Sequence, residues 1–508
     1  MLMKDFVTRL ALTALLAGAS GHATAQIVPS NGLAARPGEF VLPPSLPACP
    51  PVPAPVGFAS ISDGTAITAE DIQKFNVEWM NPDWCAYELS QAQKDFSYRQ
   101  AGWGYATRMR SMTRMYELTQ DERYLNHLRQ FIELILFYRD DHYPGNSDPA
   151  CKRCEPTPID DFRGGHVAGW GGVQFGNLSG ISEDLTGVLT YPIATFARFV
   201  AEDPSLQADY GSDAVRYANS AMETMWALMP QMKFQNVGNF IEGYLASPDS
   251  YRTKLTQQVC QGNEECDNDH DFAGSPLEYN GNGAFMMTLI ELWRALDSPF
   301  YRASAPQTNL VELTRTLIPV LVSRFQRFFA DHLQTRTDTL NGVPRFYWNY
   351  SDGGGSHHPE DIGHGSIDMQ YVDELRRNVD RLNAVLTPVG EPIVFDNSYL
   401  SRFASTFLWK IAGGAWNSGG SVFAHDVDGR NPDFTNNTEC DGWVNLAAAA
   451  GDVYQICREA SLRVVNGGQP SLTIGAHSAL LMNKQFSGVG EPPADSNPPD
   501  PHCGKFSC

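Results

Sequence analysis

Residues able to carry acid–base chemistry gather most densely between positions 347 and 368. This stretch combines aromatic rings, a glycine-rich segment, histidines and neighbouring carboxylic acids. Burying so many polar groups together costs free energy unless they bind or react with something. We therefore take the stretch as the candidate functional site, and the members that we single out are Trp348, Tyr350, His358, Glu360, Asp361, His364 and Asp368.

The spacing inside this cluster predicts the start of a helix. Pro359 suits the first helical turn because its φ is already fixed near the helical value. Glu360 and Asp361 would then lie where the helix dipole stabilises carboxylates, and only one of the two would point at a substrate. Asp361, His364 and Asp368 follow at spacings i, i+3 and i+7, on one face, where a carboxylate can orient the histidine as a general acid or base. The structural alternative is that the acids cap the helix and the histidine is a core residue.

Aromatic and polar residues on several loops extend the candidate site. Trp348 and Tyr350 would offer a sugar ring an apolar face while polar groups hold its hydroxyls. The further candidates are His166, Trp170, Glu278, Tyr279, Asn280 and Arg402. Two of these have plain structural alternatives, a glycine turn around Trp170 and an N-cap at Asn280.

Alternate carboxylates at Asp267, Asp269 and Asp271 are similar to a calcium-binding loop. The glycine and the distal glutamate of that motif are not in register. A structural calcium ion there is the weaker interpretation, and we expect no other metal or cofactor.

Helical stripes must position these residues. Apolar side chains recur at helical spacing from Tyr105 to Tyr116 and again from Leu125 to Leu136, with a capping box predicted at 119–122 between them. Two antiparallel helices joined by a short turn are expected. Similar stripes cover residues 185–200, 214–229, 284–296, 310–329, 369–386, 399–412 and 443–457. Their irregular spacing argues against an α-solenoid, which repeats at a fixed period.

Four stretches resemble a known architecture. They are residues 115–125, 137–141, 277–280 and 359–365, which read MYELTQDERYL, FYRDD, LEYN and PEDIGHG. They resemble hairpins of the six-hairpin glycosidase-like and alginate-lyase-like (α/α) toroid proteins, and the general pattern spans most of the chain. The resemblance implies an all-α fold, an (α/α) toroid of helical hairpins with long aromatic and glycine-rich loops and minor β content. Those superfamilies contain glycoside hydrolases, polysaccharide lyases and members without an assigned activity.

Hydrolysis is the first of three function classes. An inverting glycosidase needs an acid and a base carboxyl group roughly 6.5 to 9.5 Å apart. Glu360 or Asp361 would supply one, and the other would come from Glu278, Glu242 or Asp368.

Elimination and simple binding are the other two classes. A polysaccharide lyase neutralises a uronate carboxylate and removes the proton next to it, for which Asn280, His364, His166, Tyr350 and Arg402 are available. A glycan-binding protein without catalysis would use the aromatics alone. The net charge of −21 argues against nucleic acid as a partner and counts modestly against polyanionic substrates. We therefore expect glycoside hydrolysis ahead of elimination.

The N-terminus predicts export. Lys4 and Arg9 precede a short apolar run from Leu10 to Ala19, and Ala23 to Ala25 form a small-residue cleavage site. The run is shorter than the about 20 residues that a membrane helix needs. We expect a signal peptide at 1–25, a proline-rich segment at 26–57, one domain at 58–486 and a proline- and glycine-rich tail at 487–508, in a secreted or periplasmic protein.

The cysteines fit an oxidising compartment. There are ten of them, which allows up to five disulfides. Three expected pairs are close in sequence: Cys151–Cys154, Cys260–Cys266 and Cys503–Cys508. The remaining four cysteines allow three pairings, of which we expect Cys49–Cys85 with Cys440–Cys457.

Overall fold

The computed structural model describes residues 64–80, 104–142, 160–175, 178–237, 240–255, 273–337, 342, 344–351, 358–412, 423–429, 440–462 and 472–487. The predicted signal peptide, the proline-rich segment, nearly all of the tail and the aspartates at 267, 269 and 271 lie outside these residues. Within them the fold is mostly helical, as expected, and the few strands are short.

The helices run in one long series. The α-helices are α2 (Ala69–Trp79), α5 (Ala106–Thr119), α6 (Glu122–Phe137), α7 (Glu183–Glu202), α8 (Gln207–Leu228), α9 (Tyr251–Lys254), α12 (Tyr279–Asp297), α13 (Pro299–Ser304), α14 (Asn309–His332), α15 (Ile362–Leu386), α16 (Asn397–Thr406), α18 (Gly451–Leu462) and α19 (Ile474–Asn483). Shorter turns of helix are η3 (Met229–Gln231), η5 (Thr387–Val389), η6 (Phe407–Ile411), η7 (Trp443–Ala448) and η8 (Lys484–Phe486).

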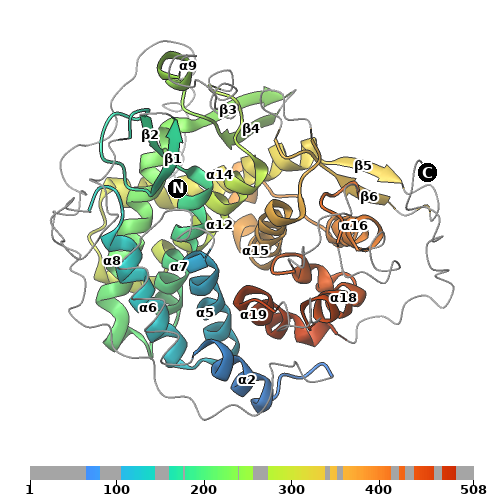
Figure 1. Ribbon diagram of the computed structural model, residues 1–508. Coiled ribbons are helices and arrows are strands. Elements are labelled where there is room, and N and C mark those ends of the chain that lie inside the picture. The colour runs from blue at the N-terminus through green and yellow to red at the C-terminus, as the bar shows by residue number, and fades with distance from the viewer. Residues whose placement is uncertain are drawn as a thin grey trace.

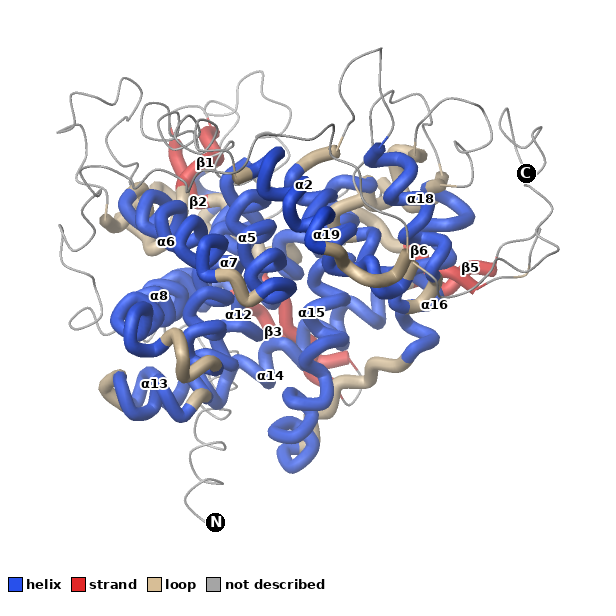
Figure 2. The backbone as a smooth tube through the Cα atoms, turned by 90° about the horizontal axis from the view of Figure 1, so that it is seen from below, coloured by secondary structure: helices blue, strands red, loops and turns tan. Residues whose placement is uncertain are grey.

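The strands form three separate antiparallel pairs. These are β1 (Gly171–Phe175) with β2 (Leu178–Ile181), β3 (Met232–Val237) with β4 (Phe240–Leu245), and β5 (Gln334–Thr337) with β6 (Pro344–Tyr347). In the third pair Gln334 lies opposite Tyr347 and Thr337 opposite Pro344. Strand β6 packs on α16, and both views place the β5–β6 pair beside that helix (Figures 1 and 2).

The predicted hairpin at residues 105–136 is confirmed, but its turn differs from the expected one. Thr119 is the last residue of α5, and Gln120 ends that helix in the left-handed region with φ of 56°. Asp121, not Thr119, caps α6, accepting a hydrogen bond of 3.0 Å from the Arg123 amide. Helix α5 therefore ends and helix α6 begins within the polar stretch 119–122.

Two other predicted helices are interrupted. The stripe at 399–412 begins as α16 and continues as a π-helical turn, η6. The stripe at 443–457 splits into the 3-10 turn η7 and helix α18, because Ala449 and Ala450 lie between them. Hydrophobic spacing marked the buried face correctly but did not reveal these breaks.

Helices α7 and α12 share the most extensive contact in the molecule. Gly187 of α7 allows it, since a Cβ at that position would lie 2.9 Å from the backbone nitrogen of Phe285. Helix α12 also packs on α15 and α14, and α6 and α8 lie outside α5 and α7 (Figure 1). One large apolar core runs through these interfaces.

The disulfide Cys440–Cys457 is confirmed, and it joins the segment before η7 to α18. The other expected pairs fall outside the described residues. Among the helices that the structure describes, none has the length and apolar character to cross a membrane.

Candidate active site

Carboxylates gather at the N-terminal ends of three neighbouring helices. Asp184 lies in the first turn of α7, Glu278 is the N-cap of α12, and Asp361 is the N-cap of α15. All three interact electrostatically with the hydroxyl of Tyr350. Because α12 packs on both α7 and α15, the fold brings together acids that are far apart in the sequence, at helix ends where negative charge is stabilised.

Asp361 and His364 form a hydrogen-bonded ion pair. One Asp361 oxygen caps α15, accepting from the amides of Gly363 at 2.8 Å and His364 at 2.9 Å. The other oxygen pairs with Nδ1 of His364. The predicted i, i+3 contact is thus present, and it is made through Nδ1 of His364.

The pair shifts both of its pKa values. Burial opposes charge on Asp361, yet the hydrogen bonds and the charge of His364 outweigh it and lower the pKa of Asp361. Burial likewise works against the charged form of His364, yet Asp361, with smaller contributions from Asp184 and Asp368, raises the pKa of His364 above its ordinary 6.5. The histidine is therefore held as a cation over a wider pH range than usual.

Glu360 and Asp368 make a buried acid pair beside the ion pair. Both are almost fully buried, at 0% and 1% exposed. Burial and the adjacent Asp368 raise the pKa of Glu360 well above its usual value. Burial also raises the pKa of Asp368, to about 7, although Nε1 of Trp348 donates a hydrogen bond of 2.9 Å to it. Glu360 is thus the protonated partner, and Asp368 can change charge near neutral pH.

Glu360 lies before α15, and backbone hydrogen bonds to two other segments fix its position. Its amide donates to the Trp348 carbonyl at 3.1 Å, and its own carbonyl accepts from Val427 at 2.9 Å. Pro359 pairs with Asn349 in an isolated β-bridge, so the prediction that it opens the helix was wrong. Because Glu360 and Asp361 both precede α15, both carboxyl groups approach His364, with ligand atoms within 4.8 Å of one another.

Tyr350 lies between two histidines. Its ring stacks on His358 with centroids 5.1 Å apart and meets His364 edge-on at 5.0 Å. Burial and the acids Glu278 and Glu360 raise the pKa of Tyr350, so its hydroxyl stays protonated. His358 is exposed. This trio of rings is the aromatic surface at the site.

Three aromatic residues that we expected to bind substrate are buried instead. Trp170 and Trp348 are 0% exposed and Tyr279 is 1% exposed. Nε1 of Trp170 donates to the Ile135 carbonyl at 2.9 Å, and the Tyr279 ring packs against Phe328 and Phe329. No ring face is left for a sugar, so their predicted stacking role needs correction: these rings pack the core beneath the site.

The remaining candidates have mixed positions. Asn280 is not the cap of α12 but lies inside it, 1% exposed, and its Nδ2 has no hydrogen-bond partner among the residues that the structure describes. Glu242 is buried in β4 and accepts from Gln235 at 2.8 Å. His166 is exposed on a loop. Arg402 lies over the Phe346 ring and donates to Thr335 at 3.2 Å, contacts that do not involve the acid cluster.

Asp184 is the site residue that the sequence did not single out. It belongs to an acidic pair, Glu183 and Asp184, at the start of an apolar helix, which is also an ordinary capping pattern. Only the packing of α7 on α12 brings it near His364 and Tyr350. The sequence offered one clue: like Glu360 and Asp361, these two acids stand next to each other at the start of a helix.

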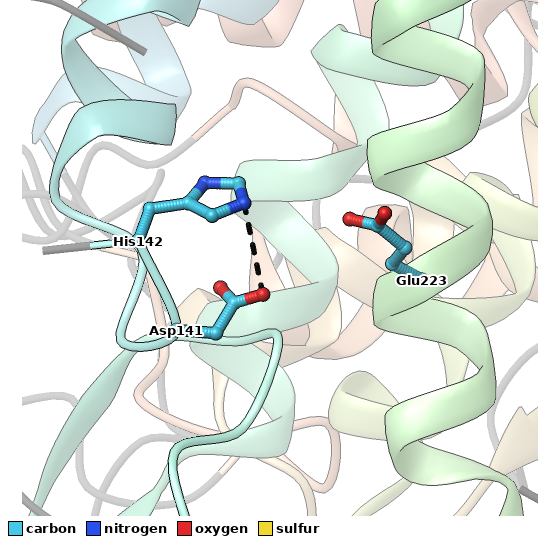
Figure 3. A group of neighbouring side chains, drawn as sticks. All are labelled: Asp141, His142 and Glu223. Carbon is cyan, nitrogen blue, oxygen red and sulfur yellow. Dashed lines mark ion pairs between the residues drawn. The ribbon is translucent and has the colours of Figure 1, made fainter. Parts of the chain in front are cut away.

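Two groups of described residues have spacing that a metal ion could use: Asp141, His142 and Glu223, and Glu360, Asp361 and His364. In the first group the side chains face one another (Figure 3). Arg139 already supplies their cation, donating to Asp141 at 2.7 Å and to Glu223 at 2.5 Å and contacting His142 at 2.9 Å. In the second group the Asp361 oxygens and Nδ1 of His364 are engaged in the cap and ion pair described above.

Comparison of the chain with protein-family models, with curated proteins and with solved structures gives no significant match. The functional argument therefore rests on the geometry of the site.

Proposed function

We propose that this protein is a carbohydrate-active enzyme that cleaves glycosidic bonds by acid/base hydrolysis, at a site on the rim of an (α/α) toroid. The observation that carries the proposal is the convergence of Asp184, Glu278 and Asp361 on Tyr350. Hydrolysis of a glycosidic bond needs two carboxyl groups in different protonation states near a sugar-sized opening. Export to the periplasm or the medium remains part of the proposal.

The helix contacts support the toroid. Helix α5 packs on α7, α7 on α12, α12 on α15, α15 on η7, η7 on α19, and α19 on α5. This series returns to its start, and three further helices each pack on two neighbouring members of it: α6 on α5 and α7, α8 on α7 and α12, and α14 on α12 and α15. In a ring of this kind the N-terminal ends of α7, α12 and α15 share one rim, where the acids lie.

The burial of the acids suggests their roles. Asp361 is charged and partly exposed, so it fits the carboxylate that activates water, and His364, held as a cation by the ion pair, orients it. Glu278 and Asp184, partly buried beside Tyr350, are the candidates for the acid at the leaving oxygen. Glu360 and Asp368 are too buried to touch a sugar and serve as positioning residues behind Asp361.

The test is a screen of purified protein against neutral and uronate-containing polysaccharides, following reducing ends and ultraviolet absorbance together. Reducing ends without new absorbance are expected. Glu278→Gln and Asp361→Asn should each lower kcat by about 100-fold or more, whereas Asp297→Asn, at an acid that is 46% exposed, should not. If both site variants keep full activity, the assignment of the site is wrong.

A polysaccharide lyase is the second candidate. The observation in its favour is the placement of Tyr350 between His358 and His364, since tyrosine and histidine are the usual groups for proton removal next to a uronate. The surrounding carboxylates would repel a uronate, which is why we place it second. New absorbance on a uronate polymer would establish it, and binding without cleavage would establish a glycan-binding protein.

A further inference from the structure

A polar cavity lies between the same helices, beyond the candidate active site. Its walls come from α5, α7, α12, α15, η7 and α19, and it is partly open to solvent. The polar lining includes Arg110, Arg114, Tyr191, Gln370, Asp373 and Arg377. On α15 these residues follow His364 by six to thirteen positions, roughly 9 to 20 Å along a helix.

Two arginines at one end of this cavity share a single carboxylate. Arg110 and Arg114 both form ion pairs with Asp441. Each arginine side chain is only 11% exposed and Asp441 is 15% exposed. Arg110 also donates to Gln370, and Arg114 donates to the Gly475 carbonyl at 3.2 Å. Because two guanidinium groups share one carboxylate, one positive charge is left without a partner charge, and little solvent reaches it.

The other end of the cavity is electrostatically balanced, because burial and the charge of Glu291 raise the pKa of Glu374 to about 8, so that two arginines face two charged carboxylates. Arg377 donates to Glu117 and Glu374, both at 3.1 Å, and pairs with Asp373 at 3.3 Å. Arg376 also binds Asp373, at 2.7 Å. The uncompensated charge therefore belongs to the pair Arg110 and Arg114.

Arg110 has an unused donor. Its Nε is buried and has no hydrogen-bond partner among the described residues, and Arg110 is one of the residues that line the cavity. Burial lowers the pKa of Arg110, Asp441 opposes this, and Arg114 adds to the lowering. A buried charged donor left unpaired costs free energy, which a ligand with the opposite charge would recover.

We propose that this cavity binds a small oxyanion, held by Nε of Arg110 and by the shared positive charge of Arg110 and Arg114. A guanidinium edge matches planar or tetrahedral oxygen groups and gives charge-assisted hydrogen bonds. A carboxylate, a sulfate or a phosphate group has this chemistry. The site is separate from the acids near His364, so the proposal does not depend on hydrolysis.

The test follows thermal stability in a bis-Tris buffer free of carboxylate, sulfate and phosphate, with sodium sulfate replacing sodium chloride at constant ionic strength. Sulfate should raise the melting temperature of the wild-type protein in a saturable way, as expected for a ligand that binds only the folded state. Arg110→Gln should weaken the apparent affinity about tenfold. The control Arg302→Gln removes an arginine that is 47% exposed and should respond like the wild type.

Equal or unsaturable stabilisation in all three proteins would overturn the proposal, because it would show a general salt effect. If Arg110→Gln does not fold, Arg110→Lys keeps the charge while removing Nε, and it should still lose affinity. A crystal grown with selenate gives an independent answer. An anomalous peak within hydrogen-bond distance of Arg110 Nε supports the site, and an empty cavity at saturating selenate refutes it.

Discussion

At the residue scale, the ion pair of Asp361 and His364 makes a prediction about pH. Burial disfavours the charged histidine, and Asp361 overcomes this to raise the pKa of His364. Asp361→Asn keeps the oxygen that caps α15, since asparagine is a good N-cap, but removes the charge. With burial then dominant, the pKa of His364 should fall from above 6.5 to that value or lower. Histidine resonances followed by NMR from pH 5 to 9 would measure it, assigned by their loss in His364→Ala.

The same pair contributes to stability in a defined pH window. A raised histidine pKa stabilises the fold below the unfolded value of 6.5 and ceases to do so as pH rises through the folded value. A lowered aspartate pKa stabilises it above 3.8 and ceases to do so as pH falls through the folded value. The contribution should be greatest between these two values. An unchanged histidine pKa in Asp361→Asn would contradict the pair.

The buried acids Glu360 and Asp368 predict that the stability of the fold decreases as the pH rises. The pKa of Asp368 is raised by burial to about 7, so the folded state holds a proton that the unfolded state releases near 3.8. Wild-type stability should therefore fall as pH rises from about 4 to about 7. Glu360→Gln provides a permanent N–H donor to Asp368, lowers its pKa and should flatten this slope. Urea unfolding at pH 5 and pH 8 measures the difference between variant and wild type.

Asp368→Asn is the matched control, because its amide oxygen can still accept from Trp348. It should flatten the slope in part, since it removes one titrating group and leaves Glu360, whose pKa burial also raises. A slope in either variant as steep as in the wild type would exclude a proton held by this pair.

The sequence predicted a contact between site residues only where the two residues are close in the sequence. The contact between Asp361 and His364 followed from helical spacing and is present. The roles of Trp170, Trp348 and Tyr279 did not follow, because composition cannot distinguish a ring that lines a site from one that packs beneath it. Asp184 was missed because its contact with His364 spans two helices, and no local pattern encodes that.

At the element scale, the α7–α12 interface makes a prediction at Gly187. Alanine in a helix interior normally gains about 1 kcal/mol over glycine. Here the new Cβ would lie 2.9 Å from backbone atoms of α12, which cannot move as a flexible side chain can. Gly187→Ala should therefore destabilise the protein by about 1 to 3 kcal/mol, measured by urea unfolding.

Gly281 provides the comparison within the same interface. A Cβ there would meet Asp184 Cβ at 3.4 Å, an ordinary contact. Gly281→Ala should thus be neutral or stabilising. Loss of stability in both variants would mean that the interface tolerates no added methyl group, and the specific argument from Gly187 would fail.

Element boundaries were less predictable than element existence. The stripes from 185 to 386 match α7, α8, α12, α14 and α15 because their apolar faces repeat over several turns. The break after η7 was not foreseen, since alanines at 449 and 450 carry no signal that stops a helix. Tertiary contacts hold the start of η7: the amide of Gly442 donates to Ser366 Oγ at 2.8 Å, and Nε1 of Trp443 donates to the Ile362 carbonyl at 2.9 Å.

At the scale of the whole molecule, the segment around Cys440 connects distant parts of the chain. Asp441 binds Arg110 and Arg114 of α5, and Gly442 and Trp443 bind the first turns of α15 near His364. The disulfide Cys440–Cys457 ties this segment to α18 across a sequence separation of 17. It therefore holds in place a segment that both the acid cluster and the arginine cavity contact.

Replacing both cysteines by serine tests this connection. The chain-entropy argument predicts a loss of about 3 kcal/mol for a loop of this length, measured by urea unfolding of the oxidised proteins. If the segment also positions α15, the double variant should lose its sulfate response and its raised His364 pKa before it unfolds globally. Loss of stability with both local properties intact would limit the disulfide to stabilising the fold. Unchanged stability would show that the contacts of Asp441, Gly442 and Trp443 hold the segment without it.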